Sequence, residues 1–329
     1  MKIAVFSTQG YDREFFERFN KSFNHQLTYF DVSLNASSLP LVNGFDGVCV
    51  FVNDTLDKAI IEKLAEAGIK VIGLRCAGFN NVDINAARES QISVVRVPAY
   101  SPHAVAEHAV ALILTLNRKT HKAFNRVREH NFSLEKLLGF DLYNKTAGVI
   151  GTGVIGQAFC HIMLGFGCRV LAYDISESAA IKEMGARYVP LDELLRSSDI
   201  ISLHCPLTPA TKHLMNKESF EKMKDGAMLI NTGRGALINT SDAIDALKNG
   251  KLGYLGIDVY EQEGDFFFRD LSESIIPDEL LSRLMTFPNV LITAHQGFFT
   301  KEALEQIAIT TLQNFSDVEM NRPLKNQVG

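Results

Sequence analysis

Short apolar runs rich in β-branched residues alternate with amphipathic stretches along the first hundred residues. The amphipathic stretches predict helices near 11–23, 57–67 and 83–90. Strands and helices that alternate in this way indicate βαβ units and a parallel sheet covered on both faces. The predicted strands of this first series are residues 2–6, 47–52, 70–74 and 93–97.

The same alternation repeats further along the chain. The first series passes into the second near residues 98–102, and the residues after Phe299 predict one long helix over 300–320. A final helix that follows a complete second series often returns to the first domain. The predicted strands of the second series lie near residues 147–150, 169–173, 199–203, 227–231, 254–258 and 290–293.

Two α/β domains are therefore expected, and the first is discontinuous. We predict that residues 1–100 and 300–329 form one domain and that residues 101–299 form the second, inserted between them. Each should be a doubly wound parallel sheet, with a cleft between the two domains. The length of 329 residues and the hydrophobic fraction of 46% fit two buried cores.

A longer helix is expected at the start of the second domain. Ser101 is a suitable N-cap, Pro102 suits the first helical position, and residues 103–124 contain no breaker. The apolar positions from 104 to 116 cover too wide an arc for a surface helix. Either this helix lies in the chain's own core or it packs against a second subunit, and we favour the second subunit.

Composition narrows the class of protein. The formal net charge of −5 does not favour nucleic acid or an anionic membrane surface as a partner. No apolar run reaches the ~18 residues of a membrane span, and the amino-terminal stretch turns polar too soon for a signal peptide. The five cysteines are odd in number and never form a C-x-x-C pair. Reduced thiols in a cytoplasmic protein are the simplest interpretation.

The stretch GVIGTGVIG, residues 148–156, has the G-x-G-x-x-G spacing of a dinucleotide site. Gly151 allows the tight turn, Gly153 lets a pyrophosphate approach the backbone, and Gly156 permits close packing of helix and strand. Asp174 ends the next predicted strand, where a carboxylate binds ribose hydroxyls and repels a 2′-phosphate. The motif favours NAD over NADP, although a glycine turn in an ordinary α/β domain would have the same spacing.

Charged residues follow three later strands of the same predicted sheet. Arg234 lies between two glycines, Asp258, Glu261 and Glu263 follow the next strand, and His295 follows a very apolar one. Taken singly, each could be a solvated turn residue or a structural histidine. Parallel strands place their carboxyl ends at one edge of the sheet, where ligands of open α/β sheets bind.

Together these residue types suit hydride transfer between a nicotinamide and a hydroxyl carbon. A histidine can accept or donate the hydroxyl proton, and such positioned groups typically contribute ~10²–10⁴-fold in rate. A carboxylate on the far ring nitrogen fixes the tautomer and favours the protonated ring. An arginine polarises the carbonyl group and binds a substrate carboxylate through two hydrogen bonds.

On these motifs the chain resembles the D-isomer-specific 2-hydroxyacid dehydrogenases over essentially its whole length. The motifs are GVIGTGVIG, HCPLT, NTGRGALI, GIDVYEQE and TAHQGFFT, in that order. The resemblance implies two Rossmann-like domains, a first for substrate and an inserted one for NAD. It places the catalytic residues at Arg234, Glu263 rather than Glu261, and His295. Beyond the three glycines, it implies NAD contacts at Thr152, Val154, Ile155, Asp174, Cys205, Pro206, Thr232, Gly233 and Asp258.

The resemblance also locates the substrate. In similar enzymes, backbone N–H groups at the positions of Ala77 and Gly78 hold the substrate carboxylate. Phe51, Tyr100 and Phe298 would leave a small apolar pocket suited to a methyl side chain, although core packing is an equal alternative for Phe51 and Phe298.

RCAGFNNVD and YEQEGDFFFRD are most similar to the bacterial fermentative D-lactate dehydrogenases. The resemblance then implies NADH-dependent reduction of pyruvate to D-lactate. A dehydrogenase for bulkier 2-keto acids is the first alternative. An NAD-sensing corepressor, which would keep the same two-domain body, is the second.

The stretch HAVAEH, residues 103–108, resembles a zinc-binding helix, but the spacing argues against one. His103 and His108 lie five residues apart and therefore about 140° apart around a helix. We expect no metal.

The oligomeric state is predicted from two apolar features. The wide apolar arc of the helix from residue 103 and the stretch DFFF, residues 265–268, which looks exposed, predict a homodimer or homotetramer.

Overall fold

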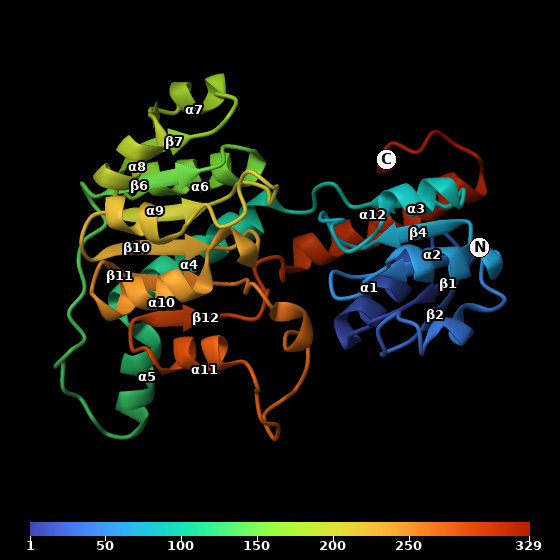
Figure 1. The fold of residues 1–329 in the computed structure, drawn as a ribbon, viewed down its shortest axis with the longest axis horizontal. Coiled ribbons are helices and arrows are strands. Elements are labelled where there is room, and N and C mark those ends of the chain that lie inside the picture. Colours follow the sequence, from blue (N-terminus) through green and yellow to red (C-terminus); the bar gives the residue numbers. More distant parts are fainter. The chain divides into compact units, whose positions relative to one another are not determined.

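The computed structural model describes residues 1–329 apart from the side chain of Asp265, and the chain forms two compact units. Unit 1 comprises residues 1–101 and 299–329, and unit 2 comprises residues 102–298 (Figure 1). Among the helices that the structure describes, none is long and apolar enough to cross a membrane.

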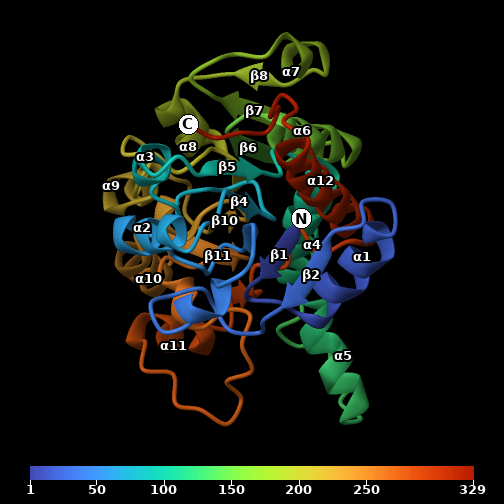
Figure 2. The same ribbon diagram turned by 90° about the vertical axis from the view of Figure 1, so that its right-hand side faces the viewer.

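Unit 1 is built on a five-stranded parallel sheet in the order β2-β1-β3-β4-β5. Helices α1 and α12 pack together on one face, and α2 and α3 pack on the other (Figure 2). The strands are β1 (Lys2–Val5), β2 (Gln26–Tyr29), β3 (Gly47–Val50), β4 (Val71–Leu74) and β5 (Ser93–Arg96). The helices are α1 (Gly10–Asn20), α2 (Lys58–Glu66), α3 (Ile84–Glu89) and α12 (Lys301–Glu319), with a 3-10 turn η1 at Leu39–Val42.

Unit 2 contains a seven-stranded parallel sheet in the order β12-β11-β10-β9-β6-β7-β8. The strand order reverses between β6 and β9, so the predicted doubly wound α/β fold is confirmed. The strands are β6 (Thr146–Ile150), β7 (Arg169–Tyr173), β8 (Arg187–Tyr188), β9 (Ile200–Leu203), β10 (Ala227–Asn231), β11 (Leu252–Ile257) and β12 (Val290–Ile292). The helices are α4 (Pro102–Arg118), α5 (Thr120–Arg128), α6 (Val154–Gly165), α7 (Ala179–Glu183), α8 (Leu191–Ser197), α9 (Lys217–Lys222), α10 (Thr240–Lys248) and α11 (Glu279–Thr286), with 3-10 turns η2 (Gly235–Leu237) and η3 (Glu263–Asp265).

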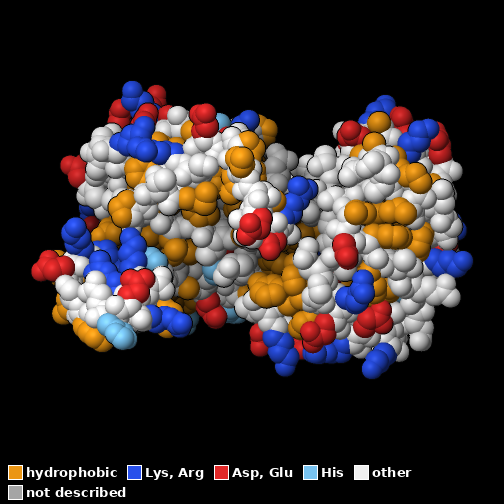
Figure 3. Space-filling view, turned by 90° about the horizontal axis from the view of Figure 1, so that it is seen from below, with side chains coloured by type: hydrophobic (Ala, Val, Ile, Leu, Met, Phe, Trp, Pro, Cys, Tyr) orange, Lys and Arg blue, Asp and Glu red, His pale blue; other side chains and the backbone are white. Residues whose placement is uncertain are grey.

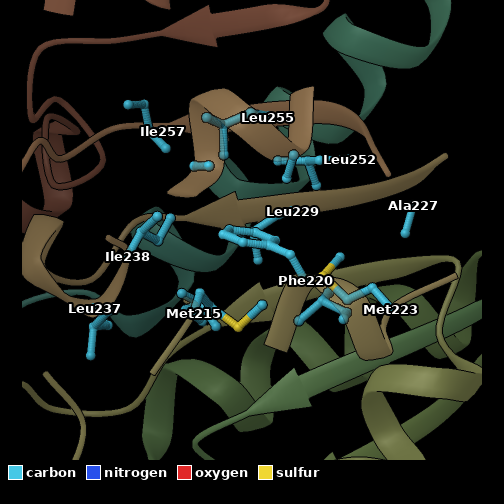
Figure 4. Packing of buried hydrophobic residues seen from close by; sticks show 14 of the residues in the cluster. Met215, Phe220, Met223, Ala227, Leu229, Leu237, Ile238, Leu252, Leu255 and Ile257 are labelled. Carbon is cyan, nitrogen blue, oxygen red and sulfur yellow. The ribbon is translucent and has the colours of Figure 1, made fainter. Parts of the chain in front are cut away.

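Apolar side chains fill both sides of the unit 2 sheet. On one side, Leu229 and Leu255 of the sheet pack with Phe220, Met223 and other residues of the covering helices (Figure 4). A second cluster is formed with α4 and α6 on the other side. On the face shown in Figure 3, acidic and basic side chains are interspersed with apolar ones.

The predicted continuous helix over 103–124 is wrong at one point. Helix α4 ends at Arg118, Lys119 takes a left-handed backbone with φ 51°, and α5 follows. The side-chain amide of Asn117 hydrogen-bonds the backbone N–H and C=O of Phe140 at 2.8 and 2.7 Å. These contacts with a distant loop end the helix at a place where the sequence has neither Gly nor Pro.

The wide apolar arc of α4 is largely covered within unit 2. Ala106, Ala109 and Ile113 are fully buried, because α4 packs against α6, β10 and β11. Of the two alternatives for this helix, the structure therefore supports burial in the chain's own core rather than the subunit contact that we favoured. The expectation for DFFF also fails in part, since Phe267 is buried; Asp265 lies outside the described side chains.

Candidate active site

The glycine motif forms the turn from β6 into α6. Gly151 has φ 95°, and a Cβ added there would lie 2.3 Å from the backbone nitrogen of Cys205. A Cβ on Gly156 would lie 2.0 Å from the carbonyl oxygen of Gly151. Gly153 is the N-cap of α6, with no side-chain cap and open space where its Cβ would be. No side chain therefore caps the first N–H groups of α6, which leaves them available to a bound pyrophosphate.

Asp174 lies at the end of β7, next to this turn. Its carboxylate accepts hydrogen bonds from the Thr152 N–H at 2.6 Å, the Thr152 hydroxyl at 3.1 Å and the Ser176 N–H at 3.2 Å. Partial burial alone would raise the pKa of Asp174, but these hydrogen bonds outweigh it and lower the pKa below its usual range. The group is thus a carboxylate at neutral pH. Two apolar side chains of these segments are exposed: Val154 at the start of α6 (61%) and Ile175 directly after Asp174 (98%).

Cys205 and Pro206 follow β9, and the Cys205 backbone lies against the glycine turn. The Cys205 backbone is the group that an added Cβ on Gly151 would strike. Burial raises the pKa of the Cys205 thiol to about 11, so it is protonated and unreactive at neutral pH. The contribution of this segment to the site is consequently its backbone and shape.

The turn after β10 presents Arg234. Asn231, fully buried, accepts a hydrogen bond from the Gly233 N–H at 3.0 Å and donates one to the Arg234 carbonyl at 2.9 Å. The guanidinium is partly exposed and donates to the Gly233 carbonyl at 2.7 Å; no described carboxylate forms an ion pair with it. Sequence reasoning missed Asn231, although a polar amide at the end of an apolar strand, inside NTGRG, was the available signal. The Thr232 hydroxyl is buried with no partner among the described atoms.

Glu263 and His295 are brought together from two loops. His295 Nδ1 lies 2.7 Å from Glu263 Oε1, and Glu263 Oε2 accepts the Tyr260 N–H at 2.8 Å. The His295 side chain is 16% exposed and that of Glu263 is 22% exposed. Because the carboxylate accepts the Nδ1 proton, Nε2 is the ring nitrogen that can exchange a proton with a substrate. The other candidate, Glu261, pairs with His213 instead, at 2.6 Å.

Asp258 is buried and hydrogen-bonds the segment that carries His295. Its carboxylate accepts the Thr293 hydroxyl at 2.5 Å and the N–H groups of Gln296 and Gly297 at 2.9 and 2.7 Å. Burial would raise the pKa of Asp258, but hydrogen bonds from His108 and Thr293 lower it overall. Sequence reasoning found Asp258 and did not find Thr293, whose hydroxyl has no signature in a strand-end motif.

The predicted substrate residues are divided between the units. Phe51, Ala77, Gly78 and Tyr100 lie in unit 1, whereas Phe298 lies buried in unit 2. The carbonyl of Ala77 accepts a hydrogen bond from Arg96 at 2.6 Å, and that of Gly78 accepts one from the Cys76 thiol at 3.2 Å. Phe51 is buried, with the guanidinium of Arg75 4.7 Å from its ring centre.

The observed groups fit a bound dinucleotide. The uncapped N-terminus of α6 supplies N–H donors for a pyrophosphate, and the ionised Asp174 supplies an acceptor for a ribose. The buried Thr232 hydroxyl, which has no described partner, is available to a further polar group of the dinucleotide. Within the described side chains, no cluster of three or more His, Cys, Asp or Glu residues is arranged to bind a metal.

Comparison with known proteins agrees with this geometry. A family model described as the D-isomer specific 2-hydroxyacid dehydrogenase, NAD binding domain, matches residues 110–297. A D-lactate dehydrogenase of Escherichia coli is 52% identical over 328 residues, covering 100% of both chains. A 2-hydroxyacid dehydrogenase homolog of Haemophilus influenzae is also 52% identical over 328 residues, covering 100% of this chain and 99% of the relative.

Solved structures are similar over the whole chain. The apo-structure of D-lactate dehydrogenase from Escherichia coli has a TM-score of 0.92 at 50% identity, with 100% of both chains covered. A structure of D-2-hydroxyisocaproate dehydrogenase has a TM-score of 0.86 at 31% identity, also with 100% of both chains covered.

Proposed function

The chain belongs to the D-isomer-specific 2-hydroxyacid dehydrogenase family, and we propose that it reduces pyruvate to D-lactate with NADH. Family membership confirms the predicted resemblance, the NAD-dependent oxidoreductase class and the cofactor. The observation that carries the proposal is the His295–Glu263 pair at 2.7 Å, at the same sheet edge as the Arg234 turn and Asp258 in an NAD-binding domain. The 52% identity to a D-lactate dehydrogenase supports the substrate.

Each proposed catalytic residue has one task. NADH, when bound, supplies the hydride to the carbonyl carbon of the 2-keto acid. Protonated His295 donates its Nε2 proton to the carbonyl oxygen, and Glu263 stabilises the imidazolium through Nδ1. Arg234, which has no described carboxylate partner, is available to bind the substrate carboxylate and polarise the carbonyl.

We assign the cofactor to the residues of the glycine turn and the strand ends around it. The α6 N-terminus, with Gly151, Gly153 and Gly156, would hold the pyrophosphate, and Asp174 the adenosine ribose. Unit 2 is then the NAD-binding domain and unit 1 the substrate domain. The remaining proposed NAD contacts are Thr152, Val154, Ile155, Cys205, Pro206, Thr232, Gly233 and Asp258, and the proposed substrate contacts are Phe51, Ala77, Gly78, Tyr100 and Phe298.

A substrate series tests the proposal. We expect NADH oxidation to be fastest, as kcat/KM, with pyruvate, and slower with 2-ketobutyrate and 2-ketoisocaproate; chiral chromatography should identify D-lactate. Preference for 2-ketoisocaproate would support the dehydrogenase of bulkier acids, an alternative favoured by the likeness to D-2-hydroxyisocaproate dehydrogenase. NADH binding with no turnover of any of the three acids would contradict both dehydrogenase activities and favour the NAD-sensing corepressor.

We also propose a cytoplasmic homodimer or homotetramer acting on a small molecule. Helix α5 and the loop after it expose a run of large apolar side chains, which is unusual for a surface left in water. These are Phe124, Val127, Phe132, Leu134, Leu138 and Tyr143, each more than half exposed. All five cysteines are free thiols, which suits a reducing compartment. Light scattering of the wild type and of Leu134→Glu/Leu138→Glu tests the assembly; a monomeric wild type would refute it.

A further inference from the structure

His108, part of the stretch that resembled a zinc helix, reaches the loop that carries His295. It lies on α4, and its Nε2 is 3.0 Å from the Thr293 hydroxyl and 3.2 Å from Asp258 Oδ1. The side chains of His108 and Asp258 are 14% and 2% exposed. This contact lies entirely within unit 2.

The chemistry of these three groups fixes the direction of each hydrogen bond. The ionised Asp258 carboxylate can only accept, and the single proton of the Thr293 hydroxyl is donated to it over 2.5 Å. The Thr293 oxygen can then only accept from His108, so Nε2 of His108 carries a proton and donates it. His108 therefore donates to the Thr293 oxygen and also faces Asp258 Oδ1 directly, while Thr293 donates to Asp258, so both donors converge on the Asp258 carboxylate.

Asp258, which accepts from both donors, holds three consecutive backbone groups. Its carbonyl oxygen accepts the His295 N–H at 2.7 Å, and its carboxylate accepts the N–H groups of Gln296 and Gly297. His295 itself has φ 51°, a left-handed conformation that a residue with a Cβ keeps only when its surroundings enforce it. A Cβ on Gly297 would lie 3.0 Å from Asp258 Oδ2 and 3.5 Å from His108 Cδ2, so both side chains pack directly against this turn.

We propose that His108 is a positioning residue for His295: through Thr293 and Asp258 it fixes the left-handed turn 295–297 that directs the imidazole. The inference rests on the proposed function, since it assumes that His295 performs the proton transfer. Without the donor on α4, the Asp258 carboxylate gains rotational freedom and the turn that it holds loosens. The Nδ1–H···Glu263 hydrogen bond is then formed for a smaller fraction of the time.

Three variants separate a donor from a packing side chain. His108→Leu removes the hydrogen bond, His108→Gln keeps an N–H donor at a similar reach, and His103→Leu is the control, an exposed histidine on the same helix. At saturating NADH and pyruvate, we expect His108→Leu to lower kcat by roughly tenfold to a hundredfold, the range for a misplaced catalytic group. We expect His108→Gln to recover most of that loss and His103→Leu to match the wild type.

A second readout needs neither cofactor nor substrate. In proton NMR of the free protein, the Nδ1 proton that His295 donates to Glu263 should give a downfield resonance, assigned by its loss in His295→Ala. We expect it to broaden by faster exchange in His108→Leu and to remain in His108→Gln. Melting temperatures show whether each variant is folded.

The outcomes distinguish the inference from the proposed function. Wild-type kcat and an unchanged resonance in His108→Leu would overturn the positioning role, as would equal losses in the Leu and Gln variants, which would indicate packing alone. If the wild type fails to reduce pyruvate, or His295→Ala remains active, the proposed function fails. The resonance of the free protein then still decides whether His108 holds the turn.

Discussion

Two glutamates of one loop each pair with a histidine, yet the two pairs differ in what they can do. Glu261 Oε1 lies 2.6 Å from His213 and Glu263 Oε1 lies 2.7 Å from His295. Both histidines have left-handed backbones, with φ 53° and 51°. Neither the pairing distance nor the backbone conformation tells the pairs apart.

The difference lies in which ring nitrogen contacts the carboxylate. His213 uses Nε2, the nitrogen at the tip of the ring, so only Nδ1, close to its own backbone, is left. His295 uses Nδ1, which leaves Nε2 at the tip available to the proposed substrate. Glu261 also accepts the Thr240 hydroxyl at 3.1 Å at the start of α10, and His213 donates its N–H to the Ala236 carbonyl. The Glu261–His213 pair therefore holds neighbouring loops together. The Glu263–His295 pair leaves the Nε2 atom of His295 available for proton transfer.

The largest effect is expected when the two histidines are removed in turn. His295→Ala should lower kcat for pyruvate by about 100-fold to 10,000-fold, because it removes the group proposed to supply the proton. His213→Ala should leave kcat within about twofold of the wild type, since its loss destabilises the loops that it holds together and leaves the proposed proton donor in place. Stopped-flow or steady-state NADH oxidation measures both, and fluorescence titration should show NADH binding retained.

Arg234→Ala should lower turnover by at most a similar factor in the same assay, because it removes the group proposed to bind the substrate carboxylate. Comparable rates in His295→Ala and His213→Ala would contradict the distinction between the pairs.

The sequence predicted much of this site because the motifs are local. The β6–α6 turn follows from Gly151 and Gly156, which leave no space for a side chain. The parallel topology placed Arg234, Glu263 and His295 at one sheet edge. The choice of Glu263 over Glu261 came from family resemblance, because two acidic residues in a turn carry no local signal that decides between them.

What the sequence missed depends on contacts between distant segments. Strand β2 is half-exposed at the sheet edge and β8 has two residues, so neither has the apolar run by which strands were recognised. The helix break at Lys119 follows from Asn117 and the loop at Phe140. His108 was noticed for its spacing to His103, while its partners lie 150 and 185 residues away in the sequence.

A smaller effect is expected from the two glutamates. Glu263→Gln keeps the shape of the side chain and removes the negative charge that stabilises the protonated His295. We expect kcat to fall by about tenfold to a hundredfold. The matched variant Glu261→Gln should retain kcat and lose at most about 1 kcal/mol of unfolding free energy, since its contact with His213 is partly exposed. Urea denaturation and the pyruvate assay measure the two effects. Equal losses of kcat would assign catalysis to the loop as a whole.

The smallest effect is expected at Asp174, a carboxylate that, unlike Glu261 and Glu263, has no described histidine partner. Asp174 accepts N–H and O–H groups of Thr152 and Ser176 and forms no ion pair with a described cation, so its charge is available to the proposed ribose. Asp174→Ala removes the repulsion of a 2′-phosphate, and the ratio of kcat/KM for NADH over NADPH should fall by roughly tenfold. Glu177→Ala, an exposed carboxylate three residues further along, is the control and should keep the wild-type ratio. An unchanged ratio in Asp174→Ala would place the ribose elsewhere, even if His295 and Glu263 were shown to act as proposed.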